Sequence, residues 1–139
     1  MSSPVFQRFA RGDWPRVEAF LLGHGEPVEH AKSVLAHEEV VAWLALEGGE
    51  IVGWILTHLG VSGDGAQRGF VEDLVVALGH RGRGLARRLM ELAETYYRER
   101  GFGGMQLTVR ANNEAALRLY QSLGYITIEE RLRMWKDFT

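Results

Sequence analysis

The sequence predicts a mixed α/β domain in which helices cover both faces of a central twisted sheet. Strand-like and helix-like segments follow one another along the chain in the order β-α-α-β-β-β-α-β-α-β-β, which predicts a mixed sheet of about six to seven strands. The 70–76 segment carries apolar residues on both alternating faces, as a central strand covered on both sides does. The apolar runs 40–46 and 51–59 are joined by a Gly-Gly turn that favours a hairpin.

Local signals place the other elements. A short strand is expected over 5–9, and Asp13 can cap a following helix that carries Pro15 in its first turn, where proline is tolerated. A weaker helix is expected over 28–37. The remaining expected elements are a glycine-rich loop over 60–69, a helix beginning at 85, a strand over 105–109, a helix over 114–123, and a final hairpin of 126–130 with 133–137.

Length and composition indicate one globular domain over residues 1–139, with 46% hydrophobic and 24% charged residues. A net charge of −2 argues against a general nucleic-acid-binding protein, because only the 81–88 stretch is dense in arginine. The absence of cysteine excludes disulfides, a thiol nucleophile and thiolate metal sites. The start lacks the features of a signal peptide, and the longest apolar runs are too short to cross a bilayer. We therefore expect a cytoplasmic protein that binds neither nucleic acid nor membrane.

The most informative segment joins the 70–76 strand to the next helix. Its residues are Arg81, Gly82, Arg83, Gly84, Leu85, Ala86 and Arg87. A helix N-terminus presents backbone N–H groups and the positive end of the helix dipole, so it can bind an anion. Glycine lets the backbone approach a phosphate closely, and arginine has donors that match phosphate oxygens. The segment therefore predicts a diphosphate-binding site.

Two familiar phosphate-binding motifs do not fit this segment. The dinucleotide fingerprint requires Gly or Ala where Arg87 stands, and the Gly-Lys-Ser/Thr of the nucleotide P-loop occurs nowhere in the chain. The spacing Arg81-x-x-Gly84-x-Ala86 does fit another pattern. It resembles the Arg/Gln-x-x-Gly-x-Gly/Ala motif of the GNAT superfamily, the acetyl-CoA-dependent N-acetyltransferases.

Three further segments resemble the same superfamily, in the same order along the chain. The 113–125 segment is similar to its Asn-x-x-Ala-x-x-x-Tyr…Gly-Phe/Tyr signature, 8–13 to its first strand and helix, and 47–53 to its usual hairpin. The resemblance therefore covers essentially the whole chain. It implies a GNAT fold, acetyl-CoA as cosubstrate, and no metal.

The resemblance also implies which residues would hold acetyl-CoA. Residues 81–87 would bind its diphosphate, and main-chain groups on the preceding strand would bind its pantetheine arm where that strand diverges from its neighbour. Tyr120 corresponds to the family's general acid near the cofactor sulfur, although a core tyrosine would look the same. Asn113 would contact the cofactor, although capping the next helix would also account for it. The strand residues assigned in this way are Leu74, Val75 and Val76.

Glu72 and Asp73 are adjacent carboxylates in an otherwise apolar strand, where an unpaired charge is costly to bury. Strand alternation sends them to opposite faces, so one would line the acceptor site and the other would pair with an arginine or with backbone donors. We expect Glu72, on the face of Phe70 and Leu74, to take the proton of the acceptor ammonium directly or through water. The alternative is that both acids belong to structural ion pairs.

The acceptor is expected to be a small cationic amine. The Glu-Asp pair, residues 113–114 and the spacing to Tyr120 look most like the spermidine/spermine diamine acetyltransferase branch, and Glu26 and Glu29 are expected to attract a cation. The nearby histidines His24, His30 and His37 are spaced too loosely for a metal site.

These observations predict an enzyme that moves an acetyl group from acetyl-CoA to a primary amine by direct attack in a ternary complex. No residue suits a covalent acetyl intermediate, because cysteine is absent and no serine–histidine arrangement is visible. Two alternatives remain open: acetylation of a protein lysine or N-terminal amine, and an acyl-CoA-binding sensor without turnover. The sequence does not reveal the acceptor, the acyl-chain preference or the oligomeric state, although homodimers that pair through the last strands are common in the family.

Overall fold

The computed structural model describes residues 3–138. The chain forms two compact units, Met1–Thr108 and Val109–Thr139, and each is described by itself. In the described residues, no helix is both long enough and apolar enough to cross a bilayer.

The first unit contains a five-stranded mixed sheet whose strands follow chain order. The first four strands pair in antiparallel fashion, and the fifth runs parallel to the fourth. The predicted mixed sheet is confirmed, but it has five strands in the described part of the chain, fewer than expected. The strands are β1 (Val5–Arg8), β2 (Val40–Glu47), β3 (Glu50–Val61), β4 (Gln67–Val76) and β5 (Met105–Leu107).

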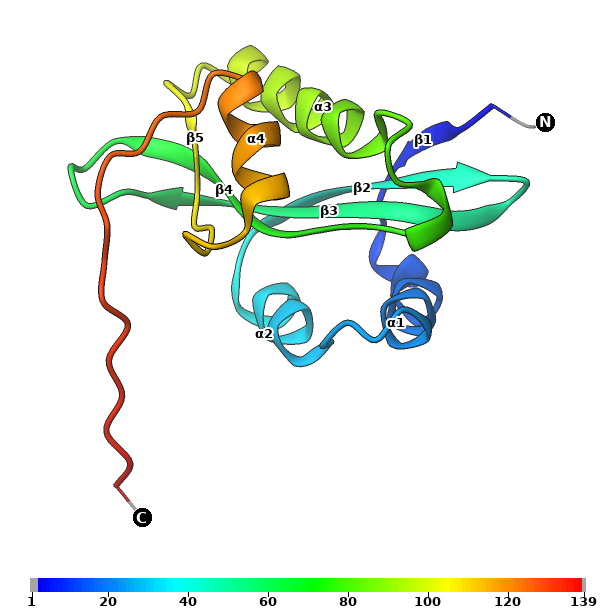
Figure 1. Cartoon of the computed structure of the whole chain (residues 1–139), viewed down its shortest axis with the longest axis horizontal. Coiled ribbons are helices and arrows are strands. Elements are labelled where there is room, and N and C mark those ends of the chain that lie inside the picture. The colour runs from blue at the N-terminus through cyan, green and yellow to red at the C-terminus, as the bar shows by residue number, and fades with distance from the viewer. Residues whose placement is uncertain (1–2, 139) are drawn as a thin grey trace. The chain divides into compact units, whose positions relative to one another are not determined.

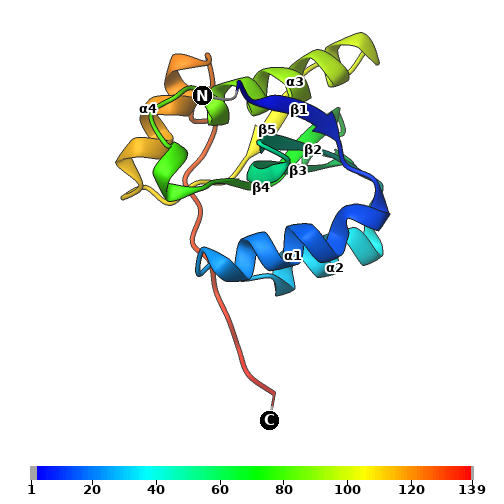
Figure 2. The same ribbon diagram turned by 90° about the vertical axis from the view of Figure 1, so that its right-hand side faces the viewer.

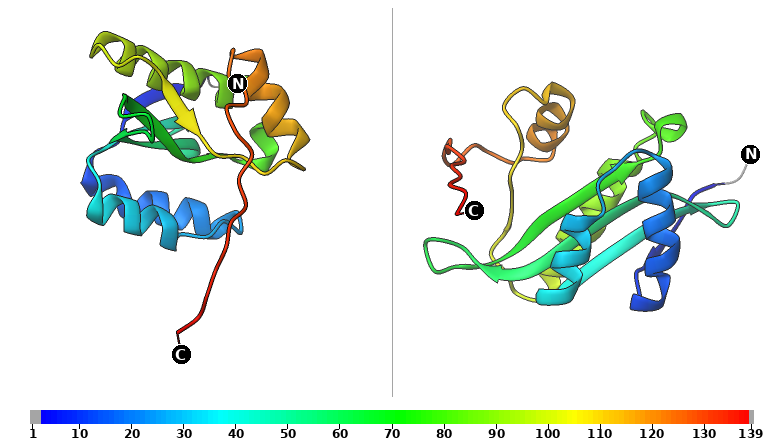
Figure 3. Two further views of the ribbon diagram at one scale, coloured as in Figure 1. Left: turned by 90° about the vertical axis from the view of Figure 1, so that its left-hand side faces the viewer. Right: turned by 90° about the horizontal axis from the view of Figure 1, so that it is seen from below.

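Helices cover both faces of this sheet, as the sequence predicts (Figures 1 and 2). The helices α1 (Trp14–Gly23) and α2 (Glu29–His37) cross one face together, and α3 (Leu85–Glu99) covers the other (Figure 3). The sheet contributes the fully buried Trp54 and Leu44 to the core, while fully buried residues of α1 and α3 complete the two sides. This burial of apolar area is the main force that holds the layers together.

The first helix begins where the sequence predicts, with Asp13 at its N-cap and Pro15 in its first turn. A short 3₁₀ turn, Arg11–Asp13, precedes α1, and the carboxylate of Asp13 accepts a hydrogen bond from the Ala10 backbone N–H at 2.9 Å. The Asp13 side chain makes no capping bond to α1 itself. It closes the preceding turn instead, because that turn offers the nearer orphan N–H group.

Only residues 62–66 of the glycine-rich 60–69 segment form a turn, so the expected loop is shorter than predicted. Strand β3 continues to Val61 and β4 begins at Gln67, so the two strands form a long hairpin with a short turn. A Cβ atom built on Gly69 would lie 2.5 Å from the ring of Tyr97 on α3. The hydroxyl of Tyr97 meets that of Thr57 at 2.7 Å in the same layer. Gly69 therefore allows the close packing of a helix on a strand, which composition alone cannot distinguish from a flexible loop.

The second unit contains α4 (Glu114–Ser122). The side chain of Asn113 accepts a hydrogen bond from the Ala116 backbone N–H at 3.2 Å, which confirms that it caps this helix. Residues 126–138 form no strand, so the predicted final hairpin is wrong for the described residues. The Arg131-Leu132 connection lacks the Gly, Asn or Asp that a tight hairpin turn favours.

Candidate functional site

The turn over residues 81–87 joins β4 to α3 as predicted, and we name it the anion-binding turn after its proposed role. Gly82 and Gly84 have positive φ angles of 77° and 79°, and Gly84 is the N-cap of α3. A Cβ atom on either glycine would meet nothing within 4 Å, so the backbone surface there is open. The first helical bond runs from the Arg88 N–H to the Gly84 carbonyl, at 3.0 Å. The amides of Leu85 and Ala86 precede that bond and belong to the part of a helix that can receive an anion.

The arginines near this turn make different contacts. Arg81 donates through Nε to the Val76 carbonyl at 3.2 Å, which ties the turn to the end of β4. Arg83 forms a two-bond pair with Glu47 of the β2–β3 hairpin, with N–O separations of 3.1 and 3.2 Å. A phosphate would have to compete with Glu47 for Arg83. The backbone of the turn therefore fits a diphosphate more directly than the Arg83 side chain does.

The end of β4 extends past β5. The two strands pair only from Gly69 with Met105 to Val71 with Leu107. Within the Met1–Thr108 unit, no strand continues beside residues 72–76 on that edge. Main-chain groups of Leu74, Val75 and Val76 therefore lie on an edge of the kind that an extended ligand can pair with.

A β-bulge at Glu72 decides where the two carboxylates point. Across the β3–β4 ladder, Thr57 pairs with Val71 and Leu56 pairs with Asp73, so Glu72 is an extra residue in β4. An extra residue interrupts the alternation of side chains between the two faces of a sheet.

Both carboxylates consequently face the side covered by α1 and α2. Glu72 contacts His30 of α2, and Asp73 accepts a hydrogen bond at 3.0 Å from the indole N–H of Trp54. Trp54 in turn lies against Trp14 of α1, with ring centroids 6.3 Å apart. The prediction that the two acids occupy opposite faces is therefore wrong, because it assumed an unbroken period of two.

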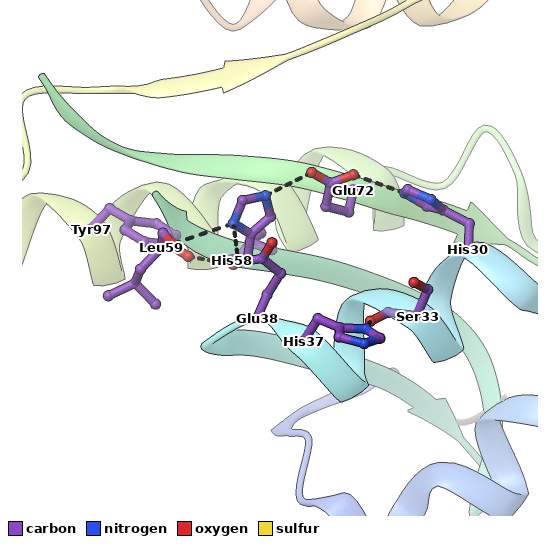
Figure 4. Close-up of polar contacts among 9 residues, drawn as sticks. His30, Ser33, His37, Glu38, His58, Leu59, Glu72 and Tyr97 are labelled. Carbon is purple, nitrogen blue, oxygen red and sulfur yellow. Dashed lines mark hydrogen bonds and ion pairs between the residues drawn. The ribbon is translucent and has the colours of Figure 1, made fainter. Parts of the chain in front are cut away.

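The Glu72 cluster (Glu72, His30 and His58) comes from three elements (Figure 4). Nε2 of His30 lies 2.8 Å from one carboxylate oxygen of Glu72, and Nε2 of His58 lies 2.8 Å from the other. His58 of β3 stacks on Phe70, with ring centroids 5.0 Å apart and an interplanar angle of 9°. Glu72 thus shares a face with Phe70 as predicted, but Leu74, one position after Asp73, alternates to the opposite face.

The other nitrogen of His58 also faces acceptors. Nδ1 lies 3.3 Å from the Leu59 carbonyl and 3.9 Å from a carboxylate oxygen of Glu38. The side chain of His58 is 15% exposed, whereas that of His30 is 60% exposed. The two histidines therefore hold the same carboxylate from different environments.

The surroundings of Asp73 act on its pKa in opposite directions. Burial raises the pKa of Asp73, the Trp54 hydrogen bond lowers it, and the nearby charges of Glu26 and His30 raise and lower it respectively. Glu26 therefore lies within electrostatic reach of Asp73, and its role in binding an acceptor stays a prediction. Glu29 is exposed at the start of α2, and the contacts of the described residues do not connect it to the Glu72 cluster.

Sequence patterns alone do not predict the contacts of His30 and His58 with Glu72. In the described residues, no group of three or more His, Asp or Glu side chains is arranged to bind a metal ion. One signal was available for His58: in the β3–β4 hairpin it lies directly opposite Phe70, two residues from Glu72. That signal can be used only when the register of the hairpin is known. The glycines of the 60–69 segment suggest a loop, so the register is hard to predict from the sequence.

In the second unit, Tyr120 lies on α4 one turn after Ala116 and packs edge-to-face on Tyr125, with ring centroids 6.0 Å apart. The proposed contact of Asn113 with the cofactor and the proposed acid role of Tyr120 stay predictions.

A family model described as the acetyltransferase (GNAT) family matches residues 6–125. The chain belongs to this family. The match includes the anion-binding turn, the Glu72 cluster and α4, so the segments that carried the resemblance are the ones that the family model recognises.

Curated relatives match over shorter stretches. Streptothricin acetyltransferase of Streptomyces lavendulae is 44% identical over 59 residues, which cover 42% of this chain and 31% of that protein. The N-alpha-acetyltransferase MAK3 of Arabidopsis thaliana is 36% identical over 88 residues, covering 62% of this chain and 45% of that protein. The matched region is thus less than half the length of each of these two relatives.

Solved structures share the fold over nearly the whole chain. AAC(6')-Iy, in complex with the bisubstrate analogue CoA-S-monomethyl-acetylneamine, superimposes with a TM-score of 0.79 at 18% identity and covers 98% of this chain and 99% of its own. A ribosomal-protein-alanine N-acetyltransferase from Brucella melitensis biovar Abortus 2308 gives a TM-score of 0.78 at 18% identity, covering 96% and 100%. At these identities the likeness shows the fold.

Proposed function

We propose that this protein transfers an acetyl group from acetyl-CoA to a primary amine, and that the acceptor is a small cationic amine. The observation that carries this proposal is the arrangement of three features in one unit. An open helix N-terminus follows a strand edge that extends past its neighbour, and that same strand presents Glu72 and Asp73 on one face.

Two parts of acetyl-CoA, its diphosphate and its pantetheine arm, have fitting backbone groups in this unit. The turn at Gly82 and Gly84 offers an open backbone and helix amides to a diphosphate. The edge at Leu74–Val76 offers main-chain groups to the pantetheine amides, and one of its N–H groups could polarise the acetyl carbonyl. One of the structural neighbours, an aminoglycoside N-acetyltransferase, is known in complex with CoA.

The reaction needs three proton movements. An amine with a pKa near 10.4 is neutral in only about one molecule in a few thousand at pH 7, so the ammonium must lose a proton before its lone pair can attack. We propose that this proton leaves through the Glu72 cluster. The amine nitrogen then bonds to the thioester carbonyl carbon, the C–S bond breaks with its electrons on sulfur, and the nitrogen releases its second proton to solvent. We assign protonation of the departing thiolate to Tyr120.

The charge of the site supports a cationic acceptor. Glu72, Asp73 and Glu26 gather on one face, and two opposite charges at contact attract each other by about 1 kcal/mol even in water. A diamine brings a second positive charge to this face, as the diamine branch of the family would suggest.

A second candidate function is acetylation of a protein N-terminal amine. It is favoured by the 36% identity to an N-alpha-acetyltransferase over 62% of this chain. A protein N-terminus carries one positive charge and a peptide backbone, so it would depend less on Glu26 and more on the strand edge.

A free-thiol release assay with acetyl-CoA tests the proposed function. The acceptor panel contains diamines, monoamines, aminoglycosides, lysine peptides and peptides with free N-termini. We expect the highest kcat/KM with a dicationic small amine and a decline as salt is added. Preferential turnover of peptides would establish the second candidate, and no thiol release with any acceptor, despite calorimetric binding of acetyl-CoA, would identify an acyl-CoA sensor.

A further inference from the structure

Both oxygens of the Glu72 carboxylate are engaged by ring nitrogens, at 2.8 Å in each case (Figure 4). A carboxylate only accepts hydrogen bonds, so Nε2 of His30 and Nε2 of His58 both carry their hydrogens. In a neutral imidazole that is protonated at Nε2, the basic lone pair is on Nδ1. Glu72 therefore selects the tautomer of both rings, and the nitrogen that can take up a proton is Nδ1.

The two Nδ1 atoms differ in what surrounds them. Nδ1 of His58 faces the Leu59 carbonyl at 3.3 Å and the Glu38 carboxylate at 3.9 Å, in a side chain that is 15% exposed and stacked on Phe70. Acceptors already occupy the approach to that atom. His30 is on α2 with its side chain 60% exposed, so an ammonium group can approach it from solvent.

Acidic groups of neighbouring segments gather near His30. They are Glu72 and Asp73 of β4, together with Glu26 in the segment before α2. These acids attract a cationic amine to the same surface, and the contact with Glu72 stabilises the imidazolium that forms after proton uptake. A carboxylate that orients and stabilises a histidine in this way is a recurrent arrangement in proton transfer.

From this geometry we propose that Nδ1 of His30 takes the proton from the acceptor ammonium, and that Glu72 and His58 are positioning residues. This inference rests on the proposed function and specifies its first step. The Nδ1 lone pair forms a bond to one ammonium proton, and the N–H bond electrons stay on the amine nitrogen as the lone pair that attacks the thioester. The exposed imidazolium then returns its proton to solvent.

The test compares His30→Gln with a matched control, His37→Gln. His37 is on the same helix, is also exposed, and has Nδ1 bonded to the Ser33 carbonyl at 2.9 Å, away from Glu72. In His30→Gln the basic nitrogen is lost, whereas an N–H donor for Glu72 is kept. We expect kcat/KM for the amine to fall by about 100-fold or more near pH 7 and its pH profile to shift to higher pH, because more of the amine must arrive already neutral, with unchanged acetyl-CoA affinity. His37→Gln should keep the wild-type values.

Two further readouts separate proton transfer from structural support. Added imidazole should restore part of the activity of His30→Ala, because it can supply the missing lone pair. Nitrogen-15 NMR of the free protein should show His30 as the Nε2–H tautomer, which is independent of turnover. A His30→Gln enzyme with wild-type kcat/KM and pH profile, or an Nδ1–H tautomer at His30, would overturn the inference. Absence of thiol release by the wild-type protein would instead overturn the proposed function.

Discussion

The anion-binding turn and the Glu72 cluster belong to the same unit, but they depend on the chain in different ways. The turn uses seven consecutive residues, and its properties come from the backbone: two positive φ angles and the start of α3. The Glu72 cluster joins α2, β3 and β4, and His30 is 42 residues from Glu72 in sequence. Its properties come from side chains that meet only in the folded protein.

Because of this difference, different substitutions should disrupt the two sites. Binding by a backbone site should be sensitive to replacement of the glycines that permit its conformation. It should be less sensitive to replacement of its other side chains, because Arg83 is already paired with Glu47. A side-chain site fails when any contributing element shifts, because hydrogen bonds lose strength steeply with distance and angle. Substitutions in both sites test this contrast.

Gly84→Glu should abolish acetyl-CoA binding, because it places a side chain and a negative charge where a phosphate would approach the α3 N-terminus. The φ angle of 79° also makes any side chain costly there, by roughly 1–2 kcal/mol of stability. Calorimetry on the folded variant checks this, with Gly63→Glu in the β3–β4 turn as a control of equal charge. Wild-type affinity for acetyl-CoA in Gly84→Glu would show that the phosphates bind outside this turn.

Tyr120→Phe tests the proposed general acid. Tyr120 is identified from a sequence motif, whereas His30 is identified only from the geometry of the folded protein. Removing the phenolic proton should lower kcat by about 10- to 1000-fold and leave acetyl-CoA affinity nearly unchanged, since a general acid acts in the chemical step. Tyr125→Phe, its aromatic neighbour, is the control. If kcat at saturation is the same in Tyr120→Phe and wild type, another group protonates the thiolate.

Glu26→Gln should raise KM for a dicationic amine about two- to fivefold, because it removes one attractive charge near Asp73 and His30. The effect should shrink at high salt. Glu29→Gln should change KM less, since Glu29 is exposed and outside the Glu72 cluster. Steady-state kinetics at two ionic strengths compare the variants, and equal effects of both would show that only the overall charge of this region matters.

Asp73→Asn addresses stability and should give the smallest effect. Burial raises the pKa of Asp73, so the unfolded chain loses this proton at a lower pH than the folded protein does. Asp73 therefore lowers the free energy of unfolding as pH rises through that range. Asparagine keeps an oxygen for the Trp54 N–H and removes the charge.

Urea unfolding at pH 3.5 and pH 7 measures how the free energy of unfolding depends on pH. The contributions of the other carboxylates cancel in the difference between Asp73→Asn and wild type. We expect Asp73→Asn to gain stability relative to wild type as pH rises. A difference between the two proteins that does not depend on pH would show that Asp73 has the same pKa in both states.

Local signals predicted much of the fold because they act within a few residues. The Gly48-Gly49 turn predicted the β2–β3 hairpin, and apolar periodicity predicted α2 within a residue of its start. Prediction failed where a residue serves a distant neighbour: Gly69 accommodates Tyr97 of α3 rather than a loop. Seventeen glycines in one chain cannot be sorted into turns and close contacts without knowing what lies opposite each one.

The conformation of the 81–87 turn can be predicted from local sequence, because positive φ angles and a helix start are set by the residues at those positions. The formation of the Glu72 cluster depends on the tertiary structure. One extra residue in β4 turned Asp73 to the same face as Glu72, and the packing of α2 on the sheet brought His30 to it. Alternation along a strand is a local rule that a bulge reverses, and a contact between distant elements depends on the register and packing of the whole sheet.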